Sequence, residues 1–189
     1  VQVSKQGYEA VSGQARVPQA VAVKEAKIVG TRTDEFGGTL TDFRISLDDP
    51  SEMAHYYGLN IYRVEPQVRY LPPNFEPDTV GFFIVPLPIE TNAPLLKRAP
   101  SGFVLQDGGL NGRTIDLLVS SSAGGLEGVQ LVAELRTVSE SYYRYQNTLQ
   151  RHIDSQDGIF GGEPVNVYSN VANGFGVIAA YHQVWKPIN

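Results

Sequence analysis

Short runs in which apolar and polar residues alternate restrict the possible folds of this chain more than any other feature. Residues 41–47 alternate strictly, and residues 129–135 do so apart from Val132. A side-chain period of two is typical of a β-strand with one buried face. Turn sequences at residues 48–50 and 107–112 follow or precede such runs, because Asp, Pro and Gly favour turn backbone. We therefore expect an all-β, antiparallel, immunoglobulin-like β-sandwich.

Further strand patterns occur between these runs. Tyr57, Leu59 and Ile61 alternate with polar residues or glycine, and residues 81–85 and 114–120 are apolar enough to form strands. Residues 66–101 are the least strand-like part, because eight prolines lie there: Pro66, Pro72, Pro73, Pro77, Pro86, Pro88, Pro94 and Pro100. Proline cannot donate to a strand ladder, so this region is predicted to hold edge strands and long loops. In the last quarter, polar turn residues bracket two further strand-like runs between residues 163 and 181.

One short helix is expected near the C-terminal quarter of the chain. Thr137 and Glu140 have the spacing of a capping box, which predicts a helix of three to four turns beginning near Ser139. Helical spacing then gives an apolar face of Tyr142, Tyr145, Leu149 and Ile153. The tyrosines can form an aromatic platform for a sugar or peptide, or they can pack on the sheet. Packing is favoured because it requires this spacing.

Composition excludes several classes of function. The net charge of −5 and the scattered Lys and Arg residues argue against a nucleic-acid partner. The absence of cysteine excludes disulfides, thiolate catalysis and Cys-ligated metals. No apolar run reaches the roughly 18 residues that a transmembrane helix needs.

The sequence contains no recognisable catalytic motif, so no catalytic, cofactor-binding or metal-binding residue is assigned. His55, His152 and His182 are too dispersed in the sequence to suggest a metal set. Residues 154–158 have a weak likeness to a calcium loop, but the series of alternate ligands is short. An ordinary turn at the end of the helix is the preferred interpretation of that segment.

The chain begins in a strand-like sequence, which allows two interpretations. Residues 1–18 are expected to be the closing strands of an upstream β-domain, with the β-sandwich domain occupying residues 19–189. The alternative is an ordinary edge hairpin that turns at Gln6 and Gly7.

A set of short motifs, in order along the chain, carries a resemblance to a known family. They are Gly7-Tyr8 to Val17-Pro18, Leu47-Asp48-Asp49-Pro50 followed by Tyr56-Tyr57, Leu110-Asn111-Gly112-Arg113, Tyr142-Tyr143-Arg144-Tyr145, Glu163-Pro164-Val165, Tyr168-Ser169-Asn170, and Asn173-Gly174-Phe175-Gly176-Val177 before a last strand. Together they make most of the chain resemble the C-terminal portion of a Bacteroidetes outer-membrane lipoprotein family known as domain of unknown function 4249. Members of that family are usually encoded beside a TonB-dependent receptor.

The resemblance implies a non-enzymatic accessory lipoprotein of a TonB-dependent transporter complex, serving nutrient capture, uptake or scaffolding. It implies a bacterial outer-membrane location, at the cell surface or the periplasmic face, through a lipid anchor upstream of Val1. Two alternatives stay open: an autonomous carbohydrate- or peptide-binding module, and a hydrolase whose site is shared with an upstream domain.

Aromatic residues are the candidate binding residues. Tyr70 and Phe75 lie in the proline-rich region, where they can contact a receptor or pin a loop to the sandwich. Tyr142 and Tyr145 are the candidates on the helix. Trp185, the only tryptophan, can contact a partner or close the last strand against the core, and the core is favoured.

Overall fold

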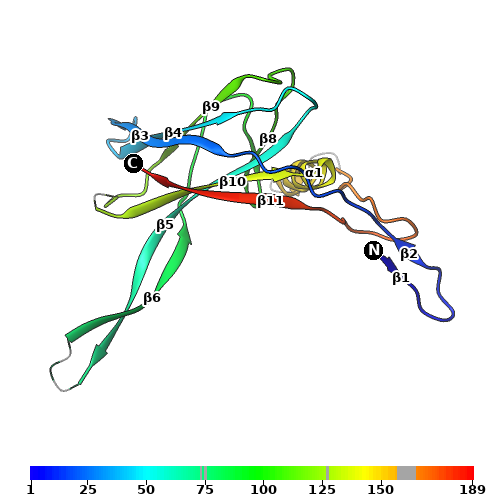
Figure 1. Cartoon of the computed structure of the whole chain (residues 1–189), viewed down its shortest axis with the longest axis horizontal. Helices are drawn as coiled ribbons and strands as arrows, with labels where there is room; N and C mark the ends of the chain where they lie inside the picture. The colour runs from blue at the N-terminus through cyan, green and yellow to red at the C-terminus, as the bar shows by residue number, and fades with distance from the viewer. Residues whose placement is uncertain (73, 75, 127, 157–164) are drawn as a thin grey trace.

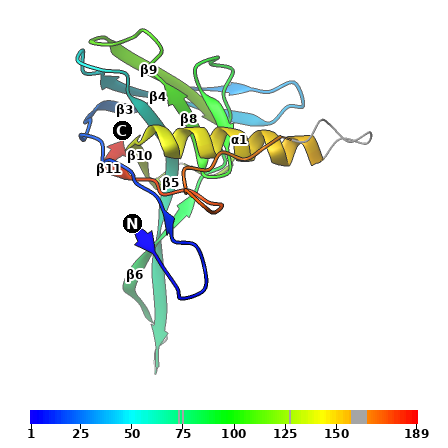
Figure 2. The ribbon, with the colours of Figure 1, turned by 90° about the vertical axis from the view of Figure 1, so that its right-hand side faces the viewer.

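The alternating runs form strands of two stacked antiparallel sheets, with one helix across an outer face (Figures 1 and 2). The computed structural model describes residues 1–72, 74, 76–126, 128–156 and 165–189. The elements in chain order are β1 (Gln2–Val3), β2 (Val11–Ser12), β3 (Val23–Thr33), β4 (Thr39–Asp48), β5 (Tyr56–Leu71), β6 (Glu76–Pro86), β7 (Lys97–Ala99), β8 (Gly102–Gln106), β9 (Thr114–Ser121), β10 (Gln130–Val138), α1 (Glu140–Gln156) and β11 (Tyr181–Ile188).

The strand order confirms the predicted immunoglobulin-like β-sandwich. One sheet has the order β3-β4-β9, and the other has the order β11-β10-β5-β8-β7. Strands β3, β4 and β9 occupy the places of A, B and E in the immunoglobulin fold, and β5, β10 and β11 occupy those of C, F and G. Strand β8 extends the second sheet as C′ does. All recorded pairings between these strands are antiparallel.

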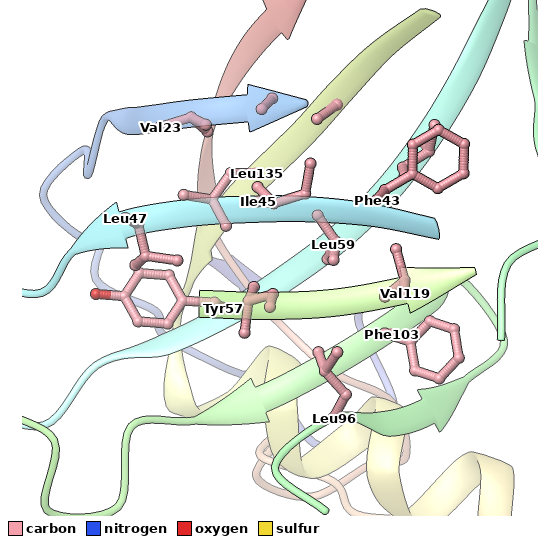
Figure 3. Packing of buried hydrophobic residues seen from close by; sticks show 14 of the residues in the cluster. Val23, Phe43, Ile45, Leu47, Tyr57, Leu59, Leu96, Phe103, Val119 and Leu135 are labelled. Atoms are coloured by element: carbon pink, nitrogen blue, oxygen red, sulfur yellow. The ribbon is translucent and has the colours of Figure 1, made fainter. Parts of the chain in front are cut away.

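The core lies between the two sheets and uses the residues that the alternation predicts (Figure 3). Phe43, Ile45 and Leu47 of β4 are fully buried against the equally buried Leu59 and Ile61 of β5. Their polar neighbours in sequence point to the opposite faces, which is the consequence of the two-residue period of a strand. Because burying such side chains is the main favourable term in folding, this pattern selects the sandwich.

The chain end joins the two sheets along one edge. The backbone N–H of Ile28 in β3 donates to the carbonyl of Asn189 at 2.9 Å, and the N–H of Asn189 donates to the carbonyl of Ala26 at 3.2 Å. The end of β11 is therefore bonded to both β10 and β3. This double pairing protects an edge that would otherwise be open.

The prediction of long loops in the proline-rich region is wrong for its first half. Residues 66–71 belong to β5 and residues 76–86 form β6, and together they make a two-stranded arm that projects from the sandwich (Figure 1). Proline is tolerated because each arm strand has a free side: β10 pairs with β5 only as far as Val64, and β6 pairs only with β5. The prediction of edge strands is confirmed by β6 and β7.

The helix begins where it was predicted, but its cap and its length differ. Ser139 is the N-cap, and its hydroxyl accepts the backbone N–H of Tyr142 at 3.3 Å. Thr137 does not take part in a capping box, because it lies in β10 and its hydroxyl accepts the N–H of Val21 at 3.2 Å. The helix spans 17 residues, which is longer than the predicted three to four turns.

The predicted apolar helix face is also shifted. Tyr143 is the buried residue of α1, and it packs with Ala99, Val104 and Val138. Tyr142 lies at the margin of that cluster, whereas Ile153 is exposed. The reason is that α1 contacts β5, β7 and β8 while its last turns extend past the sheet (Figure 2). Within the described residues, no helix has the length and apolarity needed to cross a membrane.

The N-terminal segment lies beside the residues that precede β11. Strands β1 and β2 form a hairpin that turns at Gln6 and Gly7, and Ser12 forms an isolated bridge with Ala172. The two strand-like runs predicted between residues 163 and 181 are wrong as placed, because the described residues 165–180 contain only that bridge and the last strand, β11, begins at Tyr181. The side chain of Asn170 instead orders this segment by donating to Gln14 and Ile178 carbonyls, at 3.1 and 2.8 Å.

Candidate functional site

The arm presents one apolar face. In an antiparallel ribbon, residues that pair directly share a face. Val64 pairs with Ile84, and Pro66 pairs with Phe82. Tyr70 continues the same face toward the tip, with Val68 between them. We call this set the apolar arm face: Val64, Pro66, Val68, Tyr70, Phe82 and Ile84.

The other face of the arm is charged. Arg63 and Glu65 form an ion pair at 2.8 Å, and Arg69 lies 3.7 Å from Asp78 across the ribbon. Phe83, which pairs with Glu65, is an apolar residue on this face, as are Val85 and Leu71. The arm is therefore amphipathic, like a strand at the surface of a sandwich. Its distal part, however, does not pack on a second sheet.

The apolar arm face is uncovered. Phe82 is 66% exposed, Tyr70 61% and Ile84 56%. Contiguous exposed apolar side chains mark interaction surfaces in soluble proteins. The outer edge of β6 adds unpaired backbone groups, which can pair with another extended segment. Together these features define a candidate partner-binding surface.

Sequence reasoning identified part of this surface. Tyr70 was a predicted binding residue and lies on the apolar arm face. Phe75 lies outside the described residues. Phe82 and Ile84 were missed, because residues 81–85 were interpreted only as a short apolar run able to form a strand. Their position became clear only from the pairing of β6 with the part of β5 beyond the sandwich.

A second group of aromatic residues lies on the outer face of the larger sheet. The prediction that Trp185 closes the core is wrong: Trp185 is 39% exposed, and its ring packs against that of Tyr62 with centroids 5.2 Å apart. The alternation of β11 explains this, because Ile188 packs on the core and Trp185 has the opposite parity. Tyr142 and Tyr181 form an edge-on pair nearby, at 6.0 Å.

A buried carboxylate connects these aromatic residues. Glu134 is 1% exposed and accepts hydrogen bonds from Arg136 Nε at 2.8 Å, from the Tyr62 hydroxyl at 2.9 Å and from Asn60 Nδ2 at 3.1 Å. Arg136 also donates to the Tyr142 oxygen at 3.2 Å and lies over the Tyr181 ring at 5.2 Å. We call this set the Glu134 network. The network gathers Tyr142 and Trp185 on the outer face of the larger sheet. Among the described residues, the side chain of Tyr145 makes no hydrogen bond or ring contact with the network.

The hydrogen bond between Tyr62 and Glu134 predicts that folding stability falls at alkaline pH. Burial, followed by the hydrogen bond to Glu134, raises the pKa of Tyr62 to about 12. Since an unfolded tyrosine has a pKa of about 10, the unfolded chain loses this proton first. Between pH 10 and 12 the wild type should therefore lose stability relative to a Tyr62→Phe variant. Urea unfolding of both proteins at several pH values measures this difference, and parallel pH profiles would contradict the assignment.

A third site lies at one end of the sandwich and is fully buried. Asp49 follows β4, His55 precedes β5, and Asp107 follows β8. Each residue is buried, and their potential ligand atoms lie within 4.8 Å of one another. We call this set the Asp–His cluster. The backbone N–H of His55 donates to Asp107 Oδ2 at 2.6 Å, and the Tyr57 hydroxyl donates to Asp49 Oδ1.

Burial keeps the Tyr57 hydroxyl protonated. Burial, with a further contribution from the bond to Asp49, raises the pKa of Tyr57 far above its ordinary value. The phenol therefore acts as a fixed hydrogen-bond donor to Asp49. Figure 3 shows its oxygen directed away from the labelled apolar side chains.

The Asp–His cluster was not predicted. Asp49 and Asp107 were interpreted as turn residues, and Asp107 does accept a turn hydrogen bond from the N–H of Leu110. The N–H groups of Asp49 and Asp107 instead donate to the carbonyls of the distant Arg113 and His55. The three residues are separated in sequence. The pairing of β5 with β8 places Asp107 beside His55, and Asp49 joins them from the end of β4 in the other sheet. Residues 154–158, considered above as a possible calcium loop, do not form a similar cluster of ligands. Asp154 is exposed and accepts a hydrogen bond from Gln150 at 2.7 Å, and Asp157 lies outside the described residues.

Comparison with known proteins gives one family match. A family model described as Domain of unknown function (DUF4249) matches residues 1–186. No curated protein and no solved structure matches the chain.

Proposed function

Because this chain belongs to the DUF4249 family, we propose that it is a non-enzymatic accessory subunit of a TonB-dependent outer-membrane transporter. In this proposal a lipid anchor holds the protein at the bacterial outer membrane, and the arm contacts the receptor. The subunit then assists capture or uptake of a nutrient, or stabilises the receptor complex. The observation that carries the proposal is the uncovered apolar arm face.

The arm suits a protein partner for an energetic reason. An isolated two-stranded hairpin is marginally stable in water, and its apolar side chains gain stability only when something covers them. The apolar arm face offers Phe82, Tyr70 and Ile84 as anchors, and the charged face remains compatible with solvent. Large aromatic residues supply most of the energy in many protein interfaces.

The free edge of β6 supports a partner that offers extended backbone. A loop or strand of a barrel receptor can add to this edge, so that main-chain hydrogen bonds give affinity and the apolar arm face gives selectivity. The family resemblance supplies the TonB-dependent receptor as the occupant of this surface.

Two neighbouring phenylalanines provide a matched test of the proposal. Phe82 lies on the apolar arm face, and Phe83 lies on the charged face with 52% exposure. Each is replaced by aspartate in the tagged protein, expressed in its native host. We expect wild type and Phe83→Asp to co-isolate with a large TonB-dependent receptor after gentle detergent extraction. We expect Phe82→Asp to recover about tenfold less receptor or worse, as for an interface anchor.

The controls separate binding from folding. Circular dichroism and thermal unfolding should be unchanged in both variants, because neither side chain packs in the core. Migration of wild type as a single polypeptide, without a receptor, would defeat the proposal. Equal recovery with all three proteins would exclude the arm as the contact.

The outer face of the larger sheet supports a second candidate function, the binding of a carbohydrate or peptide. Trp185, Tyr62 and Tyr181 expose aromatic rings there, and a hollow of about 410 Å³ lies beside them, lined in part by Asn60, Tyr62 and Arg136. Rings with adjacent hydrogen-bonding groups suit such ligands. Glycan-array binding that is lost in Trp185→Ala but retained in Phe82→Asp would favour this function.

A further inference from the structure

The Asp–His cluster concentrates charge where no solvent can compensate it. The side chains of Asp49 and Asp107 have no exposed surface, and that of His55 has 8%. Two ionised carboxylates in such a place are strongly unfavourable unless a positive charge accompanies them. No Lys or Arg is recorded in an ion pair with either carboxylate among the described residues.

Three atoms of the cluster lack hydrogen-bond partners among the described residues. They are Asp49 Oδ2, His55 Nδ1 and Asp107 Oδ1. Buried polar atoms in folded proteins are almost always paired, so three orphans in one cluster call for an explanation. All three belong to side chains that commonly bind metals.

The distances exclude direct hydrogen bonds from the imidazole. His55 Nδ1 lies 3.7 Å from Asp49 Oδ1 and 3.9 Å from Asp107 Oδ2. A hydrogen bond from nitrogen to oxygen spans about 2.7–3.2 Å. Two ligands of one tetrahedral Zn²⁺ ion lie about 3.3 Å apart, as follows from bond lengths of about 2.0–2.1 Å. These two separations exceed that value by about 0.4–0.6 Å, and the ligand atoms of all three residues lie within 4.8 Å of one another, so the side chains must move closer together to bind one ion.

We propose that Asp49, His55 and Asp107 bind one structural Zn²⁺ ion. His55 supplies Nδ1 and each aspartate supplies a carboxylate oxygen, which neutralises the two buried negative charges. The fourth position is filled by water or by the second oxygen of an aspartate. Tyr57 and the His55 backbone N–H hold the two carboxylates in place, as supporting hydrogen bonds do in known metal sites.

The donor set selects zinc over the common hard cations. Ca²⁺ takes 6–8 oxygen ligands and Mg²⁺ prefers six, mostly water, whereas this cluster is closed and contains an imidazole. Imidazole together with few carboxylates suits Zn²⁺ and related first-row ions. Placement at the ends of β4, β5 and β8 gives the ion a structural role, because it would bridge both sheets.

An entry path for the ion is present. His55 lines a hollow of about 1010 Å³ between the loop after β4, the start of α1 and residues 14–19. The charged residues that line this hollow are Glu52, Glu140 and Arg16. The net negative lining favours the approach of a cation.

The test uses the full chain without an affinity tag. The protein is treated with a chelator, dialysed against excess Zn²⁺ and then against metal-free buffer, and its metal content is measured by mass spectrometry. We expect one Zn²⁺ per chain. At free Zn²⁺ of about 100 times Kd, we expect the thermal midpoint to rise by about 5–10 °C. A folded wild type that retains no stoichiometric zinc would overturn the proposal.

Histidine variants identify the ligand. His55→Gln should weaken zinc binding at least about tenfold. The matched control is the double variant His152→Gln/His182→Gln, in which the two histidines outside the cluster are removed, and it should retain one Zn²⁺. Loss of zinc in the double variant, or unchanged zinc in a folded His55→Gln, would show that the ion binds elsewhere. If His55→Gln does not fold, the wild-type stoichiometry and the double variant still decide the question.

Discussion

Replacing Leu117 by alanine is expected to lower the free energy of unfolding by about 2–5 kcal/mol. Leu117 lies in β9, is 1% exposed and packs in the core between the two sheets. Truncation removes the transfer free energy of the buried atoms and leaves a cavity that the tightly packed neighbours cannot fill. Urea unfolding monitored by circular dichroism measures the change.

The next residue along the same strand provides the control. Leu118 is 49% exposed on the opposite face of β9. Leu118→Ala should change the free energy of unfolding by about 0.5 kcal/mol or less, as surface substitutions usually do. The two variants share chemistry, strand and local backbone, so they differ only in burial. Equal losses in both would contradict the assignment of the core face of β9.

Replacing Arg136 by methionine should destabilise the protein by about 3 kcal/mol. The substitution leaves the buried Glu134 carboxylate with only the neutral donors of Tyr62 and Asn60. An unpaired buried charge typically costs about 3–5 kcal/mol. We expect the lower end, because the Arg136 side chain is 18% exposed and two neutral donors remain. Chemical denaturation near pH 7 measures the loss.

A second substitution separates the charge from the packing. In the double variant Glu134→Gln/Arg136→Met neither residue is charged, and stability should return to within about 1 kcal/mol of the wild type. The double-mutant cycle then yields a coupling between the two positions. The cycle also uses the single variant Glu134→Gln. If the losses of the two single variants add up to that of the double variant, the Glu134–Arg136 ion pair does not stabilise the fold.

Sequence alone predicted the parts of the fold where the pattern of apolar and polar residues is compatible with only one structure. The period of two at residues 41–47 identified both the strand and its buried face, because a sandwich buries one side of each strand. Residues 81–85 are a continuous apolar run without such alternation, and β6 there pairs with a part of β5 that lies beyond the sandwich. Local sequence does not determine whether a second sheet lies beneath a strand.

The candidate sites depended even more on long-range pairing. Tyr70 was predicted, and its apolar neighbours Phe82 and Ile84 could be grouped with it only through the register of β5 and β6. Asp49 and Asp107 each fit a turn in sequence terms, and their proximity to His55 depends on the pairing of β5 with β8 and on the stacking of the two sheets. The N-cap of the helix could not be assigned from sequence for a similar reason. Thr137 and Ser139 are both suitable N-cap residues, and Ser139 takes this role because β10 extends to Val138 and so includes Thr137.

The continuity of β5 has a consequence for the entropy of binding. Strand β5 runs through 16 residues from the core into the arm, so the arm is an extension of a packed strand rather than a loop. A flexible segment must lose backbone freedom when it binds, at about 1–2 kcal/mol for each residue that becomes fixed. Pairing with β6 and the continuation of β5 into the core hold the arm backbone extended, so a partner has less backbone to immobilise than it would in a flexible loop. The arm is in this sense preorganised.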